Sequence, residues 1–288
     1  MSVPVRAADL GPAAHGVFTT AHGGVSTPPW AAAASGGLNL GPHVGDDPGH
    51  VRANRERVTE LVGGPVAWMT QVHGTAVRIV AGAGAGATAA GDTPAPTAGE
   101  AFGETVGEAD VLVALPRAGE TVSVGVMVAD CVPLLLADGA GRAAAAVHVG
   151  RAGLVAGAVP AALEALADAG VAPSDLSAHL GPSICGRCYE VPAPLRDEVA
   201  AVHPAAGSTT RDGTPGLDVA AAVHAQLDAL GVTRVTREHA CTYEDEALYS
   251  YRRATHAGER RTGRFAGIVT VGAGLARRVE PATPTSSS

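Results

Sequence analysis

Apolar residues in the middle of the chain form short continuous runs that are separated by Gly, Pro and Asp. The runs cover residues 109–115 (ADVLVAL), 121–129, 132–136 and 143–148. Continuous apolar runs of this length are typical of strands that are buried on both faces. We therefore expect four buried β-strands in this region.

Two later segments have a helical pattern. Residues 154–169 stop before a glycine and contain Pro160, which predicts either a kink or a later helix start. Residues 218–230 begin at Asp218, a residue suited to an N-cap, and stop before Gly231. We expect a helix in each segment.

A last apolar run, residues 265–271, follows an Arg-containing loop. Strands and helices therefore alternate irregularly and not in regular β-α-β order, which favours an α+β fold over a Rossmann sheet. Residues 81–107, rich in Ala, Gly, Thr and Pro, are expected to be a flexible insertion, and residues 279–288 a disordered tail.

Charge and composition exclude several classes of protein. The formal net charge is −8, and no basic stretch reverses this locally, so we expect no nucleic-acid partner. All 20 basic residues are Arg. The absence of Lys excludes a P-loop lysine, a Schiff-base lysine and a lysine general base.

The first residues, MSVPVRAADLG, lack the charged and apolar regions of a signal peptide, and no apolar run reaches membrane-spanning length. We expect a cytoplasmic protein without a membrane partner. Four cysteines are too few for a disulfide framework in a chain of 288 residues, so each is considered as a ligand, a nucleophile or a core residue. They are Cys131, Cys185, Cys188 and Cys241.

Three sequence patterns give weak or negative indications. The glycine run 82–87 resembles a nucleotide-binding loop, but it lies in low-complexity sequence and no helix clearly follows it. Cys185 and Cys188 form a CxxC that is either a redox pair or half of a zinc site; because no second CxxC exists, partial burial beside the active site is favoured. The chain has no HxE, which argues against a nucleobase deaminase of the zinc type.

Three residues that can ligate a metal lie at the edges of apolar runs: His73 in QVHG, Cys131 in ADCVP and His148 in VHVG. A strand end followed by Gly or Pro keeps a side chain outside the core while rigid neighbours fix it. Two imidazoles and a thiolate suit catalytic zinc and leave a fourth position for water or substrate. The spacing alone leaves two hypotheses open, a metal site and ordinary core residues.

Further motifs extend along nearly the whole chain. They are GGVS at 23–26, NLG at 39–41, GDDP at 45–48, Asn54-Arg55, the segment 148–153, GPSICGRCYEV at 181–191 and the segment 241–264, which contains CTY and YSYRR. In this order, and together with QVHG and ADCVP, they resemble the YfiH or laccase-domain family, also called purine nucleoside phosphorylase-like and peptidoglycan-editing-factor-like.

The resemblance implies a layered α+β fold with mixed β-sheets, built as a single domain over residues 1–278. It also implies that His73, Cys131 and His148 form both the metal site and the catalytic set. The metal is expected to be zinc, with copper as the alternative. Four further residues are expected to bind substrate: Asn39, Arg151, Arg253 and Arg264.

The activity that the resemblance implies is phosphorolysis of adenosine, inosine and methylthioadenosine, with adenosine deamination as a further activity. The expected partners are therefore a nucleoside and phosphate. The turn from Gly150 into a helix beside Arg151 offers donors for phosphate, and Arg252, Arg253 and Arg264 are expected to add charge. Deamination requires an activated water, for which the open metal position and Asp130 are candidates.

Two alternatives remain open at this point. One is an amidase that edits peptidoglycan precursors by removing misincorporated L-serine from a UDP-muramyl precursor. The same three residues, His73, Cys131 and His148, would serve this reaction. Independently of the substrate, Cys131 can act as a nucleophile with His148 as its base in a metal-free protein, and the sequence leaves this role open beside that of a metal ligand. The other is a non-catalytic metal-binding protein.

The chain departs from the family pattern at two positions. His22 stands where the family commonly has an arginine, and residues 148–153 read HVGRAG in place of HAGWRG, which moves the arginine to position 151. Both positions are expected to face substrate.

Overall fold

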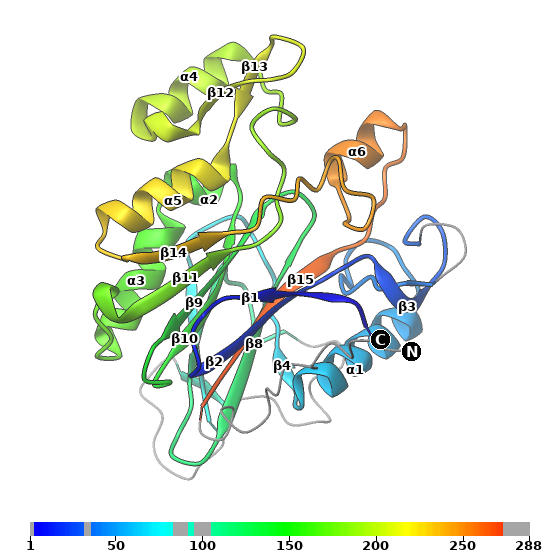
Figure 1. Cartoon of the computed structure of the whole chain (residues 1–288). Helices are drawn as coiled ribbons and strands as arrows, with labels where there is room; N and C mark the ends of the chain where they lie inside the picture. The colour runs from blue at the N-terminus through cyan, green and yellow to red at the C-terminus, as the bar shows by residue number, and fades with distance from the viewer. Residues whose placement is uncertain (1–2, 32–35, 83–91, 95–104, 273–288) are drawn as a thin grey trace, which may run out of the picture.

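The computed structural model describes residues 3–31, 36–82, 92–94 and 105–272. Two β-sheets pack face to face, and helices cover the outer faces of both (Figure 1). The expected α+β fold with mixed sheets is confirmed, because each of the two large sheets contains both parallel and antiparallel pairs.

The smaller sheet has five strands, of which only the last pair is parallel. In order across the sheet they are β1 (Val5–Ala8), β2 (Ala14–Thr19), β15 (Phe265–Gly272), β8 (Thr121–Val128) and β4 (Val66–Ala67). Two of these strands, β8 and β15, are the predicted runs 121–129 and 265–271. They form the centre of the sheet.

Helix α1 (Pro48–Val62) covers the outer face of this sheet, next to β3 (His22–Ser26). It begins after Asp47, whose carboxylate accepts hydrogen bonds from two N–H groups of the first turn, at 2.7 and 3.3 Å. Its Val58 packs in an apolar cluster with Trp68. The sequence analysis did not predict this helix.

The larger sheet has seven strands. In order they are β14 (Arg234–Arg237), β11 (Leu176–Leu180), β9 (Val132–Asp138), β10 (Ala144–Val149), β7 (Val111–Leu115), β5 (Val77–Ala81) and β6 (Asp92–Pro94). Three predicted strands, 109–115, 132–136 and 143–148, are confirmed as β7, β9 and β10. Side chains alternate along β9: Leu134 packs with the helices and Leu135 with the smaller sheet. Both faces are buried, which explains the continuous apolar run.

The predicted helix 154–169 is two helices, α2 (Arg151–Ala156) and α3 (Ala158–Asp168). The break lies at Gly157, which has a left-handed φ of 98°. Pro160 lies in the first turn of α3, where a proline needs no hydrogen-bond donor. Of the two outcomes that Pro160 predicted, the later start is therefore the one found.

The second predicted helix is confirmed as α5 (Val219–Ala229), and the Asp218 carboxylate accepts a hydrogen bond from the Ala221 N–H at 2.8 Å. The remaining elements lie mostly at the upper end of the molecule (Figure 1). They are α4 (Ala193–Val202), α6 (Tyr251–His256), a hairpin of β12 (Gly207–Thr209) and β13 (Pro215–Leu217), and the 3-10 turns Pro173–Asp175 and Pro204–Ala206.

Part of the expected flexible insertion, residues 81–107, is regular structure. Strand β6 pairs in parallel with β5, and the Val106 N–H donates to the carbonyl of Trp68 at 2.8 Å. Most of the glycine run 82–87 and the tail 279–288 lie outside the described residues. Among the helices that the structure describes, none has the length and apolar character needed to span a membrane.

Candidate metal centre and active site

The structure brings His73, Cys131 and His148 together. The candidate ligand atoms of the three residues lie within 4.8 Å of one another, and Cys131 Sγ is 3.9 Å from His73 Nε2. The two imidazole rings meet edge to face, with centroids 4.6 Å apart. Cys131 lies where the chain leaves β8 of one sheet and enters β9 of the other, so the cluster forms at the junction of the two sheets.

A buried carboxylate, Asp110, orients two of these residues. It is fully buried at the start of β7 and accepts a hydrogen bond from His148 Nδ1 at 2.8 Å. It also accepts the backbone N–H groups of Val72, His73 and Gly74, at 3.3, 3.0 and 2.7 Å. A carboxylate that holds one ring nitrogen of a histidine leaves the other ring nitrogen for a metal.

Two non-glycine residues of the site have left-handed backbone conformations, His73 with φ 61° and Asp130 with φ 93°. Such conformations cost free energy and persist only where neighbouring contacts enforce them. Gln71 supplies some of these contacts, because its side-chain amide makes two hydrogen bonds to the backbone of Met127, at 2.7 and 2.8 Å. This fixes the QVHG segment to the end of β8.

Asp130 joins three loop segments next to the cluster. Its carboxylate accepts hydrogen bonds from Thr242 Oγ1 at 2.6 Å and from the Arg252 N–H at 2.7 Å. Its carbonyl accepts the Ile184 N–H at 3.0 Å. Both carboxylate oxygens and the carbonyl thus hold neighbouring segments beside Cys131, the next residue in the chain.

Gly150 is required by close packing against the cluster. A Cβ atom at this position would lie 2.9 Å from a ring carbon of His73 and 3.0 Å from Cys131 Sγ. Any larger residue would therefore displace two of the three candidate ligands. The VHVG motif thus contains His148 and, two positions later, Gly150, whose missing side chain leaves room for His73 and Cys131.

The electrostatics favour an ionised Cys131. Burial alone would raise the pKa of this thiol, but the charge and hydrogen bonds of His148 and then His73 outweigh burial and lower the pKa to about 6. Burial would in turn lower the pKa of His148, but the Cys131 thiolate and the Asp110 carboxylate raise it to about 9. A thiolate and two imidazoles are a donor set that zinc and copper both accept.

The cluster forms the floor of a cavity of about 390 Å³, within the range of pockets that hold small organic ligands. Three arginines, Arg151, Arg252 and Arg264, line it. The other lining residues are His43, Gln71, His73, Met127, Val128, Ala129, Asp130, Cys131, His148, Gly150, Ile184, Tyr189, Val219 and Tyr251. The cavity therefore combines the cluster with a positively charged wall.

Of the four expected substrate-binding residues, Arg151 and Arg264 line the cavity, and Asn39 and Arg253 lie outside it. Asn39 is fully buried and accepts the N–H of Arg264 at 2.9 Å, so it acts on the backbone of a cavity residue. His22, at a position expected to face substrate, lies in β3 and is also outside the cavity.

Arg253 holds the segment that precedes α6. Its guanidinium donates hydrogen bonds to the carbonyls of Thr242, Tyr243, Asp245 and Leu248, the second and third at 3.1 and 3.2 Å. Its neighbour Arg252 is the one that reaches the cavity, because successive residues of a helix point in different directions.

No sequence pattern assigned a role in the site to Asp110 or to two tyrosines of the cavity wall, Tyr189 and Tyr251. The only signal for Asp110 was a charged residue at the head of an apolar run. The guanidinium carbon of Arg252 lies over the ring of Tyr189, 5.1 Å from the ring centroid. Tyr249, by contrast, packs in the core, and its hydroxyl donates to the carbonyl of Trp30 at 2.5 Å.

The fold and the cluster define a class of protein that comparison with known families identifies. A family model described as multi-copper polyphenol oxidoreductase laccase matches residues 15–272, so the chain belongs to this family. The match covers all three residues of the cluster. Membership of the YfiH or laccase-domain family, expected from the motifs, is thereby confirmed.

Individual relatives agree. A Streptomyces coelicolor protein named purine nucleoside phosphorylase is 46% identical over 259 residues, covering 89% of this chain and 95% of the relative. A Shigella flexneri protein named purine nucleoside phosphorylase YfiH is 34% identical over 257 residues, covering 87% and 91%. The crystal structure of a Neisseria meningitidis DUF152 protein superposes with a TM-score of 0.72 at 34% identity, covering 93% of this chain and 99% of that one.

Proposed function

We propose that the chain is a purine nucleoside phosphorylase that cleaves adenosine, inosine and methylthioadenosine with inorganic phosphate. The observation that carries the proposal is the presence of Arg151, Arg252 and Arg264 around one cavity with the Cys131 cluster. Guanidinium groups bind phosphate through paired, charge-assisted hydrogen bonds. In hydrolysis the attacking molecule is neutral water, which needs no group of arginines to bind it.

In phosphorolysis a phosphate oxygen forms a bond to C1′ of the ribose while the bond from C1′ to the purine nitrogen breaks. The electron pair of that bond leaves with the purine, which takes up a proton. The arginines hold the phosphate close to C1′, where its negative charge stabilises the positive charge that develops on C1′ and the ring oxygen as the bond to the purine breaks. The apolar part of the wall, including Val219 and Ile184, suits a purine ring.

His43 supplies a neutral imidazole to the same cavity. Burial lowers its pKa, and the nearby charges of Arg264 and Arg55 lower it further. A neutral imidazole accepts a hydrogen bond from a ribose hydroxyl or takes a proton during the reaction. We assign it the second of these roles in adenosine deamination, the further activity proposed here. A water oxygen adds to C6 of the purine, one water proton is taken up by N1, the other passes through His43 to the amino group, and the C6–N bond breaks so that this group leaves as ammonia.

His73, Cys131 and His148 would hold a zinc ion, or alternatively copper. When bound, the metal supplies a Lewis acid and lowers the pKa of a water molecule towards about 7. Asp110 keeps the proton of His148 on Nδ1, which faces away from the cluster. Gly150 keeps the space above the ligands open.

The test incubates the purified protein with inosine in the presence and absence of phosphate, and separately with adenosine and with a UDP-muramyl-serine precursor. Products are identified by mass spectrometry. We expect hypoxanthine and ribose 1-phosphate only when phosphate is present, and loss of both in Cys131→Ala. Free ribose without phosphate would contradict phosphorolysis. Release of serine from the muramyl substrate, with no turnover of inosine or adenosine, would favour the editing amidase instead.

A further inference from the structure

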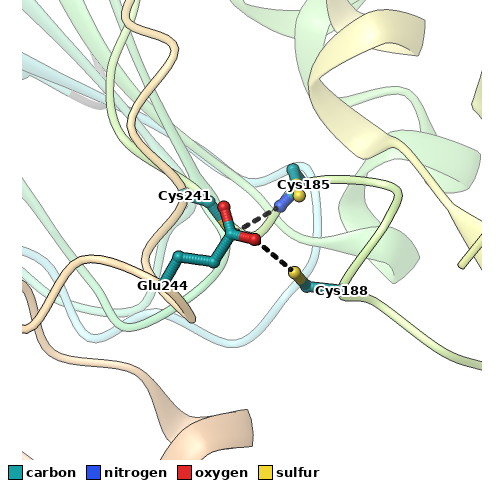
Figure 2. Close-up of side chains that lie close together, drawn as sticks. All are labelled: Cys185, Cys188, Cys241 and Glu244. Atoms are coloured by element: carbon teal, nitrogen blue, oxygen red, sulfur yellow. Dashed lines mark hydrogen bonds between the residues drawn. The ribbon is translucent and has the colours of Figure 1, made fainter. Parts of the chain in front are cut away.

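A second cluster of ligand-type side chains lies outside the Cys131 site. The side chains of Cys185, Cys188, Cys241 and Glu244 point towards one another from two separate segments (Figure 2), and their ligand atoms all lie within 4.8 Å of one another. The Cys188 thiol donates to Glu244 Oε1 at 3.4 Å, and the Cys185 N–H donates to Cys241 Sγ at 3.3 Å.

The two segments have the same local structure. In the first, the N–H groups of Cys188 and Tyr189 donate to the carbonyl of Cys185, at 2.9 and 3.0 Å. In the second, the N–H groups of Glu244 and Asp245 donate to the carbonyl of Cys241, at 3.0 and 2.9 Å. Each turn therefore places residues three positions apart on the same side, as paired turns do in four-ligand zinc sites.

A short backbone contact fixes the two turns relative to each other. Ser183 and Cys241 form a parallel β-bridge, and the N–H of Thr242 donates to the carbonyl of Ser183 at 3.1 Å. Cys241 is 5% exposed, and Cys185 and Cys188 are partly buried. The four groups are thus held together by the backbone before any ligand is present.

We propose that Cys185, Cys188, Cys241 and Glu244 form a second, structural metal site that binds a zinc ion with all four positions filled by protein. Three thiolates and one carboxylate make a tetrahedral set of the ligand types that zinc uses, and soft thiolates disfavour calcium and magnesium. This site differs from the Cys131 cluster, where three protein ligands leave a position open to the cavity.

The CxxC alone is also typical of a redox pair, but the surroundings here are those of a ligand set. A redox pair needs only its two thiols, whereas here a third sulfur, Cys241 Sγ, and the Glu244 carboxylate lie within 4.8 Å of both of them. Zinc displaces the three thiol protons to solvent as it binds.

Glu244 also forms an ion pair with Arg211, so its carboxylate is already held in place. Arg211 itself is fixed, because its N–H donates to the carbonyl of Arg187 inside the CxxC turn at 3.1 Å. A ligating carboxylate commonly has such a hydrogen-bonded partner, which orients it towards the metal. The guanidinium would therefore remain beside the site as a support for Glu244.

The position of the site indicates its role. Ile184, next to Cys185, and Tyr189, next to Cys188, line the catalytic cavity. Thr242, next to Cys241, donates to the Asp130 carboxylate at 2.6 Å. A zinc ion would join the segment that lines the cavity to the segment that holds the Asp130 carboxylate, and would keep the two at a fixed separation.

The first experiment measures zinc in the full chain by mass spectrometry, after purification with a phosphine reductant, in a Cys131→Ala background that removes a ligand of the cavity cluster. We expect zinc to be retained in this variant and lost when Cys188→Ser is added, with zinc affinity falling by at least about a hundredfold. Glu246→Gln, at an exposed carboxylate two positions after Glu244, is the matched control for Glu244→Gln.

Cobalt provides a readout that does not depend on activity. Cobalt bound to the metal-free Cys131→Ala protein should show an intense thiolate-to-cobalt charge-transfer band and the visible bands of a tetrahedral ion. Glu244→Gln should weaken or shift these bands, and Glu246→Gln should leave them unchanged. Cys188→Ser and Glu244→Gln alter partly exposed positions, so loss of folding is not expected.

Zinc content equal in Cys131→Ala with and without Cys188→Ser would overturn the proposal. The same holds for a cobalt spectrum without thiolate bands, and for a Cys185 to Cys188 disulfide recovered under reducing conditions. Because the measurement is made without Cys131, these results do not depend on whether the cavity binds nucleosides. Failure of phosphorolysis with zinc present would leave this site intact.

Discussion

The Asp110 carboxylate accepts a hydrogen bond from His148 Nδ1 at 2.8 Å, and both residues are buried. The two residues are 38 positions apart: Asp110 directly precedes β7, and His148 lies in the neighbouring strand β10. The same carboxylate holds the turn that carries His73. One side chain therefore sets the orientation of two of the three residues in the cluster.

Replacing Asp110 with Asn should weaken metal binding without removing any ligand. The side-chain NH₂ of the new Asn would face backbone N–H groups that donate to the Asp110 carboxylate in the wild type. His148 Nδ1 would lose the carboxylate that keeps its proton in place. We expect zinc affinity to fall by about ten- to a hundredfold, as measured by competition with a fluorescent chelator. Asp138→Asn is the control, since Asp138 is equally buried but pairs with Arg142 and is not among the cavity residues. Equal zinc affinity in the two variants would contradict the role of Asp110.

Alkylation of Cys131 in metal-free protein should report its lowered pKa. Only the thiolate reacts, so the rate rises as pH increases through the pKa and is constant above it. With a pKa of about 6, the rate should reach half its maximum near that pH, well below the value of 9 for an ordinary thiol. Peptide mass spectrometry after iodoacetamide treatment identifies the residue. Cys188, with a pKa of about 12, should stay largely unmodified at neutral pH.

Asp110→Asn gives a second check on the same titration. Loss of the carboxylate lowers the pKa of His148, which then offers less positive charge to Cys131. The alkylation profile should therefore shift to higher pH. A profile that does not move would mean that Asp110 has no influence on the thiol.

Gly150→Ala should abolish metal binding in a protein that still folds. The added methyl would lie 2.9 Å from His73 and 3.0 Å from Cys131 Sγ, so both side chains must move. Gly153→Ala is the matched control in α2, because its nearest new contact, at 3.4 Å, is tolerable. We expect it to keep its zinc and to gain up to about 1 kcal/mol in stability. Zinc retained by both variants would contradict the steric argument.

Arg151→Met should raise the KM for phosphate more than the KM for the nucleoside. The loss of one charged hydrogen-bond donor to the anion corresponds to about a ten- to a hundredfold increase. Steady-state kinetics with phosphate and inosine varied separately measure the two constants. Arg142→Met, on the β9 to β10 turn and not among the cavity residues, should change neither. An equal rise in both constants would indicate a general change in the cavity.

Asn54→Ala should destabilise the fold. The buried amide of Asn54 donates to Ser26 Oγ and to the carbonyls of Gly37 and Asn39, and its oxygen accepts the N–H of Val25, all at 2.9 to 3.1 Å. Leaving these groups unpaired should cost about 3 kcal/mol, measured by urea unfolding.

Arg52→Ala, at an exposed position of the same helix, should change the free energy of unfolding by less than about 0.5 kcal/mol. A similar loss in both variants would show that the buried amide has no special role.

The central strands could be predicted from the sequence, and α1 could not. Strands buried on both faces need apolar residues throughout, so β7 to β10 are visible as uninterrupted runs. The buried positions of α1 have helical spacing, Val51, Asn54, Arg55 and Val58, but two of them are polar. Because these two bond to loops that are distant in sequence, the apolar pattern of the helix is incomplete.

The same reasoning explains the candidate site. The three members of the cluster lie at the edges of apolar runs in the sequence and could be predicted together with the resemblance. Asp110 could not, because its partners are 36 to 38 positions away and no local pattern connects them. The second metal site was hidden by its fourth ligand. Its second pair reads C-x-x-E and not C-x-x-C, and it lies 56 positions after the first pair in the sequence. Only folding brings the two pairs together.

Asp130 has a further consequence for how substrate enters. Its carboxylate and carbonyl tie together the segments at Ile184, Thr242 and Arg252, so three stretches of the rim are connected through one residue. The rim is therefore cross-linked by hydrogen bonds at one residue. Tyr251, which directly precedes Arg252, lines the cavity and is 54% exposed, so its ring lies where the cavity meets solvent.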